Sequence, residues 1–311
     1  SAEEYTVSGG GGGGGVLPPG KIGYCDASYS GGTDDGSREK PYASVAAALD
    51  AKSAVDDSTE RIYDLAAGVY TVSRTIVKNS TVKQKITIRG RGPGVTILQA
   101  GASFAAGKSS DCLKLTGFGD IRVVELTIRY CKYGLHTVTC DKLDVRHVHF
   151  TQCGGSDDST NYDHSHNMVA QLAAYAANFT DGGALRADSC GALVRVLDCH
   201  VSDCNRGLRV GDSVKGGLIS GCFVERTAQS AIYSSASTYT GASGNHNFTI
   251  SGNTVISAGN NSILAIGGKD NTIADNVIKG GWNAPIQLWS CCNCTVSDNK
   301  MEKSNFSDWN G

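Results

Sequence analysis

Beyond residue 120 the chain consists of a repeat, and the length of that repeat restricts the fold more than any other feature of the sequence. The apolar positions Val196 and Ile219 are 23 residues apart, and the same spacing separates Ile250 from Ile273 and Ile273 from Val296. Each copy holds a short strand-like run, a bend with a Gly or an Asp in most copies, and a second short strand-like run. The copies span residues 123–131, 144–153, 195–204, 218–227, 249–258, 272–281 and 295–304.

A period near 23 residues, with three short strands and no helix, predicts an all-β fold: a right-handed parallel β-helix of about 9–10 coils. Successive coils of such a fold stack at ~4.8 Å, so equivalent residues form columns along its axis. A leucine-rich repeat would include a helical segment and a propeller blade has a longer period, so neither fits. One column should be an asparagine ladder of Asn253, Asn276 and Asn299, continued by Cys199 and Cys222 as small buried side chains.

The N-terminal part differs in character. Residues 1–20 contain seven consecutive glycines followed by Leu-Pro-Pro-Gly, which predicts a tail or linker. Residues 21–311 are then the β-helix domain, beginning with a capping helix over about 41–52, where Pro41 precedes small apolar residues. The 28 basic and 30 acidic residues nearly balance, so no electrostatic argument favours nucleic acid or an anionic membrane as partner. No apolar run reaches the ~18 residues of a membrane span.

Several segments together resemble the pectin lyase-like superfamily of β-helix proteins: KPYASVAAALDA near the N-terminus, then IYDLAAGVYTV, ITIRGRGPGVTIL and the asparagine-bearing coils. The resemblance covers roughly residues 24–306 and implies the fold. It implies no single activity, because this fold hosts lyases, hydrolases, esterases, epimerases and inert spikes. The last coil is followed by SNFSDWNG, and phage tail spikes that resemble this fold cover such an open end by trimerising or with a further domain. A homotrimer or a larger virion assembly is therefore expected.

A third strand follows the long turn of each coil, and alternation along it separates inward from outward side chains. The inward positions are expected to be Leu135, Leu185, Leu208, Ile232 and Ile286. The outward positions form a column of His136, Arg186, Arg209, Tyr233, Leu264 and Gln287, flanked by Asp188 and Asp212, with Ser235 and Trp289 beyond. In enzymes that resemble this fold, this strand face is the usual polysaccharide groove. The resemblance thus implies that arginines hold carboxylates or sulfates and that aromatic rings stack on sugars. An ordinary solvated sheet face is the alternative.

One long turn interrupts the repeat, because Val145 and Val196 are 51 residues apart, about two coils plus a surplus. The surplus maps to residues 154–167, which are rich in Asp157, Asp158, Tyr162, Asp163, His164 and His166. Long loops on a rigid scaffold concentrate functional residues, and this one should overhang Arg186 and Arg209. Its aspartates suit Ca²⁺ and its histidines suit a transition metal, but a solvated polar turn fits the spacing better, so no cofactor is predicted.

Three reactions are open to these groups. A hydrolase needs two carboxylates, and Asp188 and Asp212 on neighbouring coils would lie ~5–6 Å apart, the spacing of retaining enzymes, whereas a pair with Asp163 would be wider. A β-eliminating lyase needs a base and a cation that neutralises the uronate. Candidates for that base are Arg209, His164 and Tyr162. An epimerase abstracts the same proton, and NYDHSHN is distantly similar to a Tyr/Asp/His motif of mannuronan epimerases. The pectin-esterase motifs and the Gly-His-Gly of polygalacturonases are absent.

These considerations define two residue sets. The candidate catalytic residues are Asp163, His164, Asp188, Arg209 and Asp212. The candidate substrate-binding residues are His136, Tyr162, Arg186, Tyr233, Gln287 and Trp289. The favoured function is a polysaccharide depolymerase of phage tail-spike type, on a virion or extracellular, that acts on an extended anionic polysaccharide. A non-enzymatic virion spike or capsid decoration is the alternative, because no complete catalytic signature is present; a uronate-polymer epimerase is a further one.

The cysteines do not predict a zinc site, because Cys199 and Cys204 have no matching pair of ligands nearby. Cys131, Cys153 and Cys204 follow the second strand at equivalent places and should form another column of small buried side chains. Disulfides between coils are the alternative. The CCNC run at 291–294 is the cluster to test first for oxidation.

Overall fold

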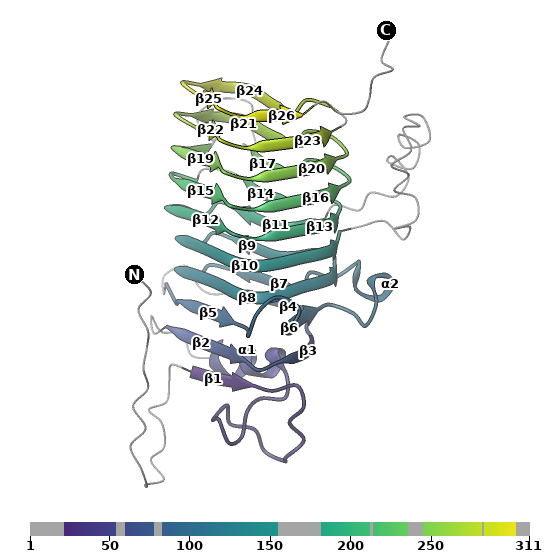
Figure 1. Ribbon diagram of the computed structural model, residues 1–311. Helices are drawn as coiled ribbons and strands as arrows, with labels where there is room; N and C mark the ends of the chain where they lie inside the picture. Colours follow the sequence, from purple (N-terminus) through teal and green to yellow (C-terminus); the bar gives the residue numbers. More distant parts are fainter. Residues whose placement is uncertain are drawn as a thin grey trace.

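The computed structural model of the chain forms a stack of coils whose strands pair in parallel with those of neighbouring coils (Figure 1). It describes residues 22–53, 60–77, 83–154, 182–211, 214–235, 245–281 and 283–302. The strands form a 17-stranded sheet, which has two arms, and a 9-stranded sheet. The fold is the right-handed parallel β-helix that the repeat predicts. The predicted linker, residues 1–20, lies outside the described residues.

Each arm of the 17-stranded sheet contributes one strand to most coils. The first arm contains β1 (Ile22–Cys25), β2 (Arg61–Leu65), β5 (Ile86–Arg89), the first half of β8 (Asp120–Cys131) and of β10 (Lys142–Cys153), β12 (Leu193–Leu197), β15 (Gly217–Ser220), β19 (Phe248–Ser251), β22 (Thr272–Ala274) and β25 (Thr295–Ser297). The second arm contains β3 (Gly68–Thr71), β6 (Thr96–Gln99), the second halves of β8 and β10, β13 (His200–Cys204), β16 (Phe223–Thr227), β20 (Thr254–Ala258), β23 (Val277–Gly281) and β26 (Lys300–Glu302).

The 9-stranded sheet carries the third strand of each coil. It contains β4 (Arg74–Val77), β7 (Leu113–Thr116), β9 (Tyr133–Val138), β11 (Gly183–Asp188), β14 (Leu208–Gly211), β17 (Ile232–Ser235), β21 (Ile263–Lys269) and β24 (Ile286–Cys292), with β18 (Asn245–His246) beside β21. The register reproduces the sequence period, since Val196 pairs with Ile219, and Ile273 with both Ile250 and Val296.

The bend between the two arms explains why Gly and Asp recur there. The bend residues have left-handed backbones: φ is 51° at Asp198, 66° at Gly221, 65° at Gly252, 57° at Asp275 and 54° at Asp298. A side chain with a Cβ enters this region at a cost, which is absent for Gly and smaller for Asp and Asn than for most residues. The sequence therefore places Gly or Asp where the coil turns.

The residue after each bend points inward and joins the coils. Asn253 Nδ2 donates to Asn276 Oδ1 at 2.9 Å, and Asn276 Nδ2 donates to Asn299 Oδ1 at 2.8 Å. The Cys222 backbone N–H donates to Asn253 Oδ1 at 3.0 Å, so the amide column ends on a cysteine. Cys199, one coil earlier, contacts the Val145 carbonyl through its thiol instead, at 3.7 Å.

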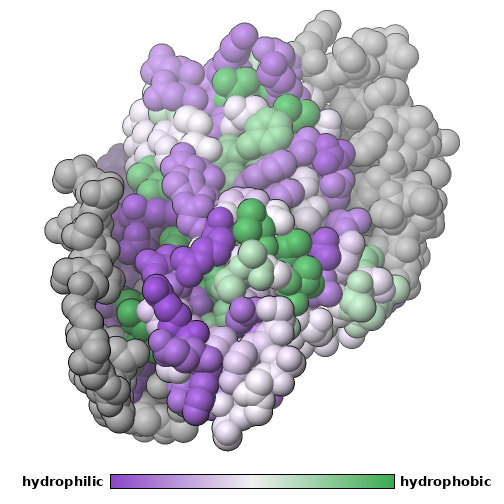
Figure 2. Space-filling view, turned by 60° about the horizontal axis from the view of Figure 1, so that its bottom comes forward, coloured by the Kyte–Doolittle hydropathy of each residue, from purple (hydrophilic) through white to green (hydrophobic). Residues whose placement is uncertain are grey.

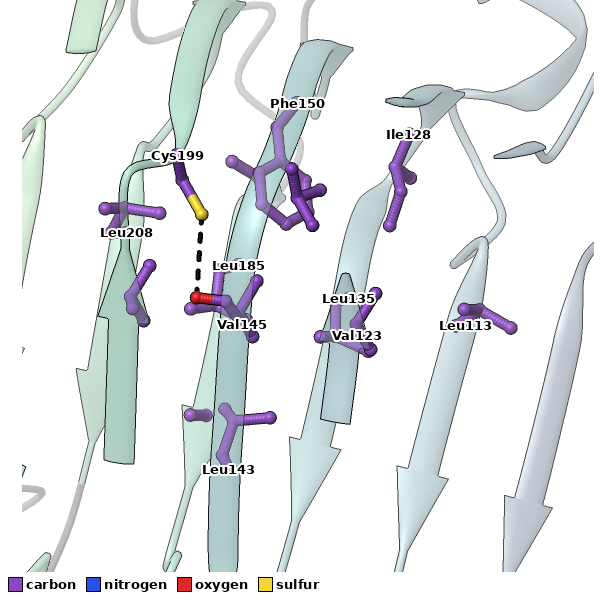
Figure 3. Packing of buried hydrophobic residues seen from close by; sticks show 14 of the residues in the cluster. Leu113, Val123, Ile128, Leu135, Leu143, Val145, Phe150, Leu185, Cys199 and Leu208 are labelled. Atoms are coloured by element: carbon purple, nitrogen blue, oxygen red, sulfur yellow. Dashed lines mark hydrogen bonds between the residues drawn. The ribbon is translucent and has the colours of Figure 1, made fainter. Parts of the chain in front are cut away.

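The interior is filled by equivalent apolar residues from successive coils. Figure 3 shows Leu113, Leu135, Leu185 and Leu208 of the 9-stranded sheet in one row, and all four are fully buried. Of the predicted inward positions, Ile286 in the last described coil is only partly buried. Apolar side chains are exposed mostly in the first and last coils: Ile22, Val69, Val77, Val95, Leu288, Trp289, Val296 and Met301. Figure 2 shows apolar patches separated by hydrophilic ones on the N-terminal end.

The capping helix is shorter than predicted. It is α1 (Val45–Ser53), so the expectation that it begins at residue 41 is wrong. Tyr42 instead forms a bridge with Cys25, and the Ser44 hydroxyl accepts from the Ala47 backbone N–H at 3.0 Å, which caps the helix. A second helix, α2 (Phe104–Gly107), has four residues. No helix in the described part of the chain is long and apolar enough to cross a membrane.

Candidate functional site

The outer face of the 9-stranded sheet carries a column of polar and charged residues. His136 of β9 pairs with Arg186 of β11, Arg186 with Arg209 of β14, and Arg209 with Tyr233 of β17. The column continues through Leu264 and Gln287, as the sequence predicts. Four predicted site residues lie outside the described residues: Tyr162, Asp163, His164 and Asp212.

Two aspartates hold the imidazole of His136 between them. Its Nδ1 lies 3.2 Å from Asp111 Oδ2 and its Nε2 lies 3.5 Å from Asp188 Oδ2. All three side chains are largely buried, with 10%, 17% and 14% of their surfaces exposed for His136, Asp111 and Asp188. His136 therefore orients the Asp188 carboxylate and has little contact with solvent.

Arg186 forms a salt bridge with Asp188, which also contacts His136. Arg186 Nε donates to Asp188 Oδ2 at 2.5 Å, and Nη1 donates to the Tyr133 hydroxyl at 3.2 Å. The guanidinium also lies over the Tyr133 ring, 5.4 Å from its centroid. Arg186 and Asp188 are two residues apart on one strand, so both side chains leave the same face. Arg186 is thus occupied by protein partners.

These contacts fix the protonation of the cluster. Burial would raise the pKa of Asp188, but hydrogen bonding to His136 and the charge of Arg186 outweigh it and lower that pKa below its usual value. Burial would lower the pKa of His136, but its hydrogen bonds with Asp111 and Asp188 outweigh it and raise that pKa. The pKa of Arg186 is raised: burial would lower it, but the charge of Asp188 outweighs this. Asp188 is consequently an ionised carboxylate and cannot act as a proton donor at neutral pH.

Arg209 differs from Arg186 because no carboxylate among the described residues pairs with it. Its guanidinium lies over the Tyr233 ring, 5.5 Å from the centroid, and its buried Nε has no hydrogen-bond partner among the described residues. Within the same part of the chain, two other buried atoms on this face also lack a partner: Asp188 Oδ1 and Gln287 Oε1. Buried polar atoms in folded proteins normally have a partner, so these atoms are exceptions to the pattern of the rest of the chain.

The structure adds several details to the sequence-based site. Asp188 pairs with Gly211, and the neighbouring Asp212 lies outside the described residues. Leu264 pairs with Tyr233 of the column but is buried. Trp289 is 43% exposed and pairs with Ile266, two positions beyond Gln287. Sequence reasoning missed Asp111 and Tyr133; Asp111 precedes β7 in the first coils, where the 23-residue period is not visible.

The 17-stranded sheet also carries arginines and acidic residues on its two arms, and these pair with one another. Asp144 accepts from Arg146 Nε at 2.7 Å and from Arg195 Nη2 at 3.2 Å, and Arg122 Nε lies 3.9 Å away. On the second arm, Arg226 Nε donates to Asp203 Oδ1 at 2.7 Å and the guanidinium also contacts Glu225. Each of these arginines therefore has an acidic partner.

The same second arm holds two stacked histidines. The rings of His149 and His200 are parallel, with centroids 4.3 Å apart. His149 Nε2 lies 3.1 Å from the Ser202 hydroxyl, and His200 Nε2 lies 3.1 Å from Glu225 Oε1. Among the described residues no group of three or more His, Cys, Asp or Glu side chains is arranged to hold a metal ion. The loop for which Ca²⁺ was considered lies outside those residues.

Comparisons with known proteins inform the fold only. No protein-family model and no curated protein matches the chain. The GH136 lacto-N-biosidase from Eubacterium ramulus is similar over 90% of this chain and 56% of its own, at 10% identity and a TM-score of 0.47. The PL6 family alginate lyase AlyGC is similar over 92% and 41%, at 13% identity and a TM-score of 0.48. This chain spans about half the length of these two proteins.

A third solved structure is similar over most of both chains. The A-module of the mannuronan C-5 epimerase AlgE4 from Azotobacter vinelandii is similar over 90% of this chain and 88% of its own, at 13% identity and a TM-score of 0.29. The parallel β-helix fold rests on the strand pairing of this chain itself. At such low identity the similarity does not extend to activity. The phage tail-spike type stays a prediction.

Proposed function

We propose that the chain binds an extended anionic polysaccharide on the outer face of the 9-stranded sheet and cleaves it by β-elimination. The observation that carries the proposal is Arg209, whose buried Nε has no hydrogen-bond partner in the described part of the chain and whose charge lowers the pKa of the neighbouring Asp188. A guanidinium is suited to a carboxylate, because its planar donors match the two carboxylate oxygens. The repeated coils, ~4.8 Å apart, present similar side chains to successive parts of an extended polymer.

Three side chains each contact a different part of one sugar unit. Arg209 pairs with the carboxylate of a uronate. Asp188 Oδ1, for which the described residues supply no partner, accepts a hydrogen bond from a sugar hydroxyl. Tyr233, which is partly exposed next to Arg209, packs against the apolar face of a sugar ring. Arg186 and His136 act indirectly, because they hold Asp188 in place and keep it ionised.

Elimination fits this cluster better than hydrolysis does. A hydrolase needs one carboxyl kept protonated as general acid and one ionised, whereas Asp188, the carboxylate beside Arg209, has a lowered pKa. In β-elimination a base takes the proton at C5 of the uronate, and the C5–H electron pair forms the C4=C5 double bond. The C4–O bond breaks, its electron pair leaves on the glycosidic oxygen, and that oxygen takes up a proton to become the hydroxyl of the new reducing end. Two of the candidate bases, His164 and Tyr162, lie outside the described residues. A cation on the uronate carboxylate stabilises the carbanion character at C5. Arg209 supplies that cation.

The test is incubation of the full chain with a panel of uronate polymers and with neutral glucans as controls. We expect ultraviolet absorbance of unsaturated sugars and new reducing ends together, from a uronate polymer only. Reducing ends without the absorbance would mean hydrolysis, and a C5-inverted polymer without new ends would mean epimerisation. Either result would overturn the elimination mechanism and leave the location of the site to be tested with Arg209 variants.

A non-catalytic virion attachment protein is the second candidate. The observation in its favour is that Asp111 and Asp188, the carboxylates of this cluster, both lie against His136, and Asp188 also against Arg186. Tight binding of a uronate polymer with no product of any kind would favour this candidate. A trimer in light scattering would support the tail-spike form of either candidate, and a monomer would contradict that form.

A further inference from the structure

Two buried cysteines meet on adjacent coils directly after the strands of the polar cluster. Cys140 follows β9 and Cys190 follows β11, with exposed fractions of 2% and 0%. Their Sγ atoms are 2.7 Å apart. The nearest comparison is Cys131 and Cys153, also register partners on adjacent coils, whose Sγ atoms are 3.4 Å apart. Sulfur is a large atom, so 2.7 Å lies well inside ordinary contact between two thiols.

The backbone holds the pair at a separation that suits a disulfide. Val138 and Asp188 are register partners, and the chains stay paired beyond the strands. The Thr139 N–H donates to the Asp188 carbonyl at 3.0 Å, and the Gly191 N–H donates to the Cys140 carbonyl at 2.8 Å. In-register strands keep their Cα atoms ~4.8 Å apart, and disulfides span Cα separations of about 4.4–6.8 Å. The bond can therefore form without moving the backbone.

We propose that Cys140 and Cys190 form a disulfide bond between the two coils. Glutathione disulfide is a sufficient oxidant. One protein thiolate attacks it and releases one glutathione thiolate, and the second protein thiolate then attacks the mixed disulfide and releases the other. The protein loses two electrons and two protons, and two molecules of reduced glutathione form. The contact with Cys140 lowers the pKa of the Cys190 thiol, which helps one member of the pair to ionise.

The bond would link the chain across the longest interruption of the repeat. It would join residues 50 apart in sequence, and residues 155–181 lie between them. It would also brace the strands that carry His136 and Asp188. The Cys190 thiol lies 3.5 Å from the Thr137 hydroxyl and 3.8 Å from the Asp188 carbonyl, so it adjoins the floor of the polar cluster. The proposal does not depend on the activity of that cluster.

Peptide mapping tests the bond directly. The full chain is folded with glutathione disulfide and reduced glutathione, denatured without reductant, alkylated with iodoacetamide, digested and analysed by mass spectrometry. We expect a linked peptide containing Cys140 and Cys190, about 2 Da lighter than the sum of its two parts, that disappears with dithiothreitol. Recovery of both cysteines in alkylated form would overturn the proposal.

A pair of double variants separates the bond from simple packing. The melting temperature of the oxidised wild type should fall by about 5 °C on reduction, because the unfolded chain loses a constraint. Cys140→Ala/Cys190→Ala should not respond to reductant. Cys199→Ala/Cys222→Ala removes two equally buried thiols elsewhere and should keep the wild-type response. A response to reductant in the first variant as large as that of wild type would contradict the bond.

Discussion

Two clusters of arginine and aspartate lie on different sheets of the same β-helix, and they differ in whether each described arginine has a carboxylate partner. On the 17-stranded sheet, Asp144 gathers Arg146 and Arg195, and its partners are 31% and 41% exposed. On the 9-stranded sheet, Asp188 is held by Arg186 and His136 in more buried surroundings, and Arg209 beside them has no carboxylate partner in the described chain. Composition alone does not separate a neutralised surface from a binding face. The presence or absence of a carboxylate partner for each guanidinium does.

The largest difference should appear when the central carboxylate of each cluster is neutralised. Asp188→Asn leaves the buried Arg186 guanidinium without its counter-charge and the His136 imidazole without one of its two carboxylate partners, and it should cost about 3 kcal/mol in free energy of unfolding. Asp144→Asn leaves arginines that water can solvate and should cost about 1 kcal/mol or less. Urea denaturation at neutral pH measures both. Equal losses would mean that the clusters do not differ in burial as described.

A smaller effect should distinguish the histidines of the two sheets by the sign of their pH dependence. The raised pKa of His136 gives stability that is complete below its unfolded pKa of ~6.5 and is lost as pH rises through the folded pKa. Burial, together with the charge of His200, lowers the pKa of His149, so its contribution is present above ~6.5 and is lost as pH falls through the folded pKa.

The matched variants are His136→Gln and His149→Gln, measured by urea denaturation at pH 5 and pH 8. The first should cost more stability at pH 5 than at pH 8, and the second more at pH 8 than at pH 5. If both variants lost more stability at the same pH, the two rings would not have opposite environments.

The smallest effect is expected for an exposed pair on the 17-stranded sheet. Arg226 and Asp203 are 38% and 43% exposed, so Arg226→Gln should cost less than 1 kcal/mol. High salt should remove most of that difference, because it screens exposed charges. Thermal melting of both proteins at low and high salt checks this. If Arg226→Gln lost as much stability as Asp188→Asn, the exposure of a charged pair would not determine its contribution to stability.

The sequence predicts the scaffold well because the scaffold repeats. The 23-residue spacing of Val196 and Ile219 sets the register, and Gly or Asp marks the bend where φ is positive. The column from His136 to Tyr233 follows directly from that register. The partners of each column member do not follow, because they depend on side-chain direction and on turns. Asp111 reaches His136 from a turn outside the repeat, and the burial of Leu264 depends on its surroundings.

Arg209 is the arginine of the proposed uronate-binding face for which the described residues supply no carboxylate partner. Isothermal titration of a uronate polymer that binds the wild type should therefore be repeated with Arg209→Gln and with Arg122→Gln, which removes the same charge from the 17-stranded sheet, where 52% of the Arg122 side chain is exposed. We predict at least a tenfold loss of affinity for Arg209→Gln, the effect of losing a charged hydrogen bond, and little change for Arg122→Gln. Unchanged binding by Arg209→Gln, or an equal loss in both variants, would contradict the account.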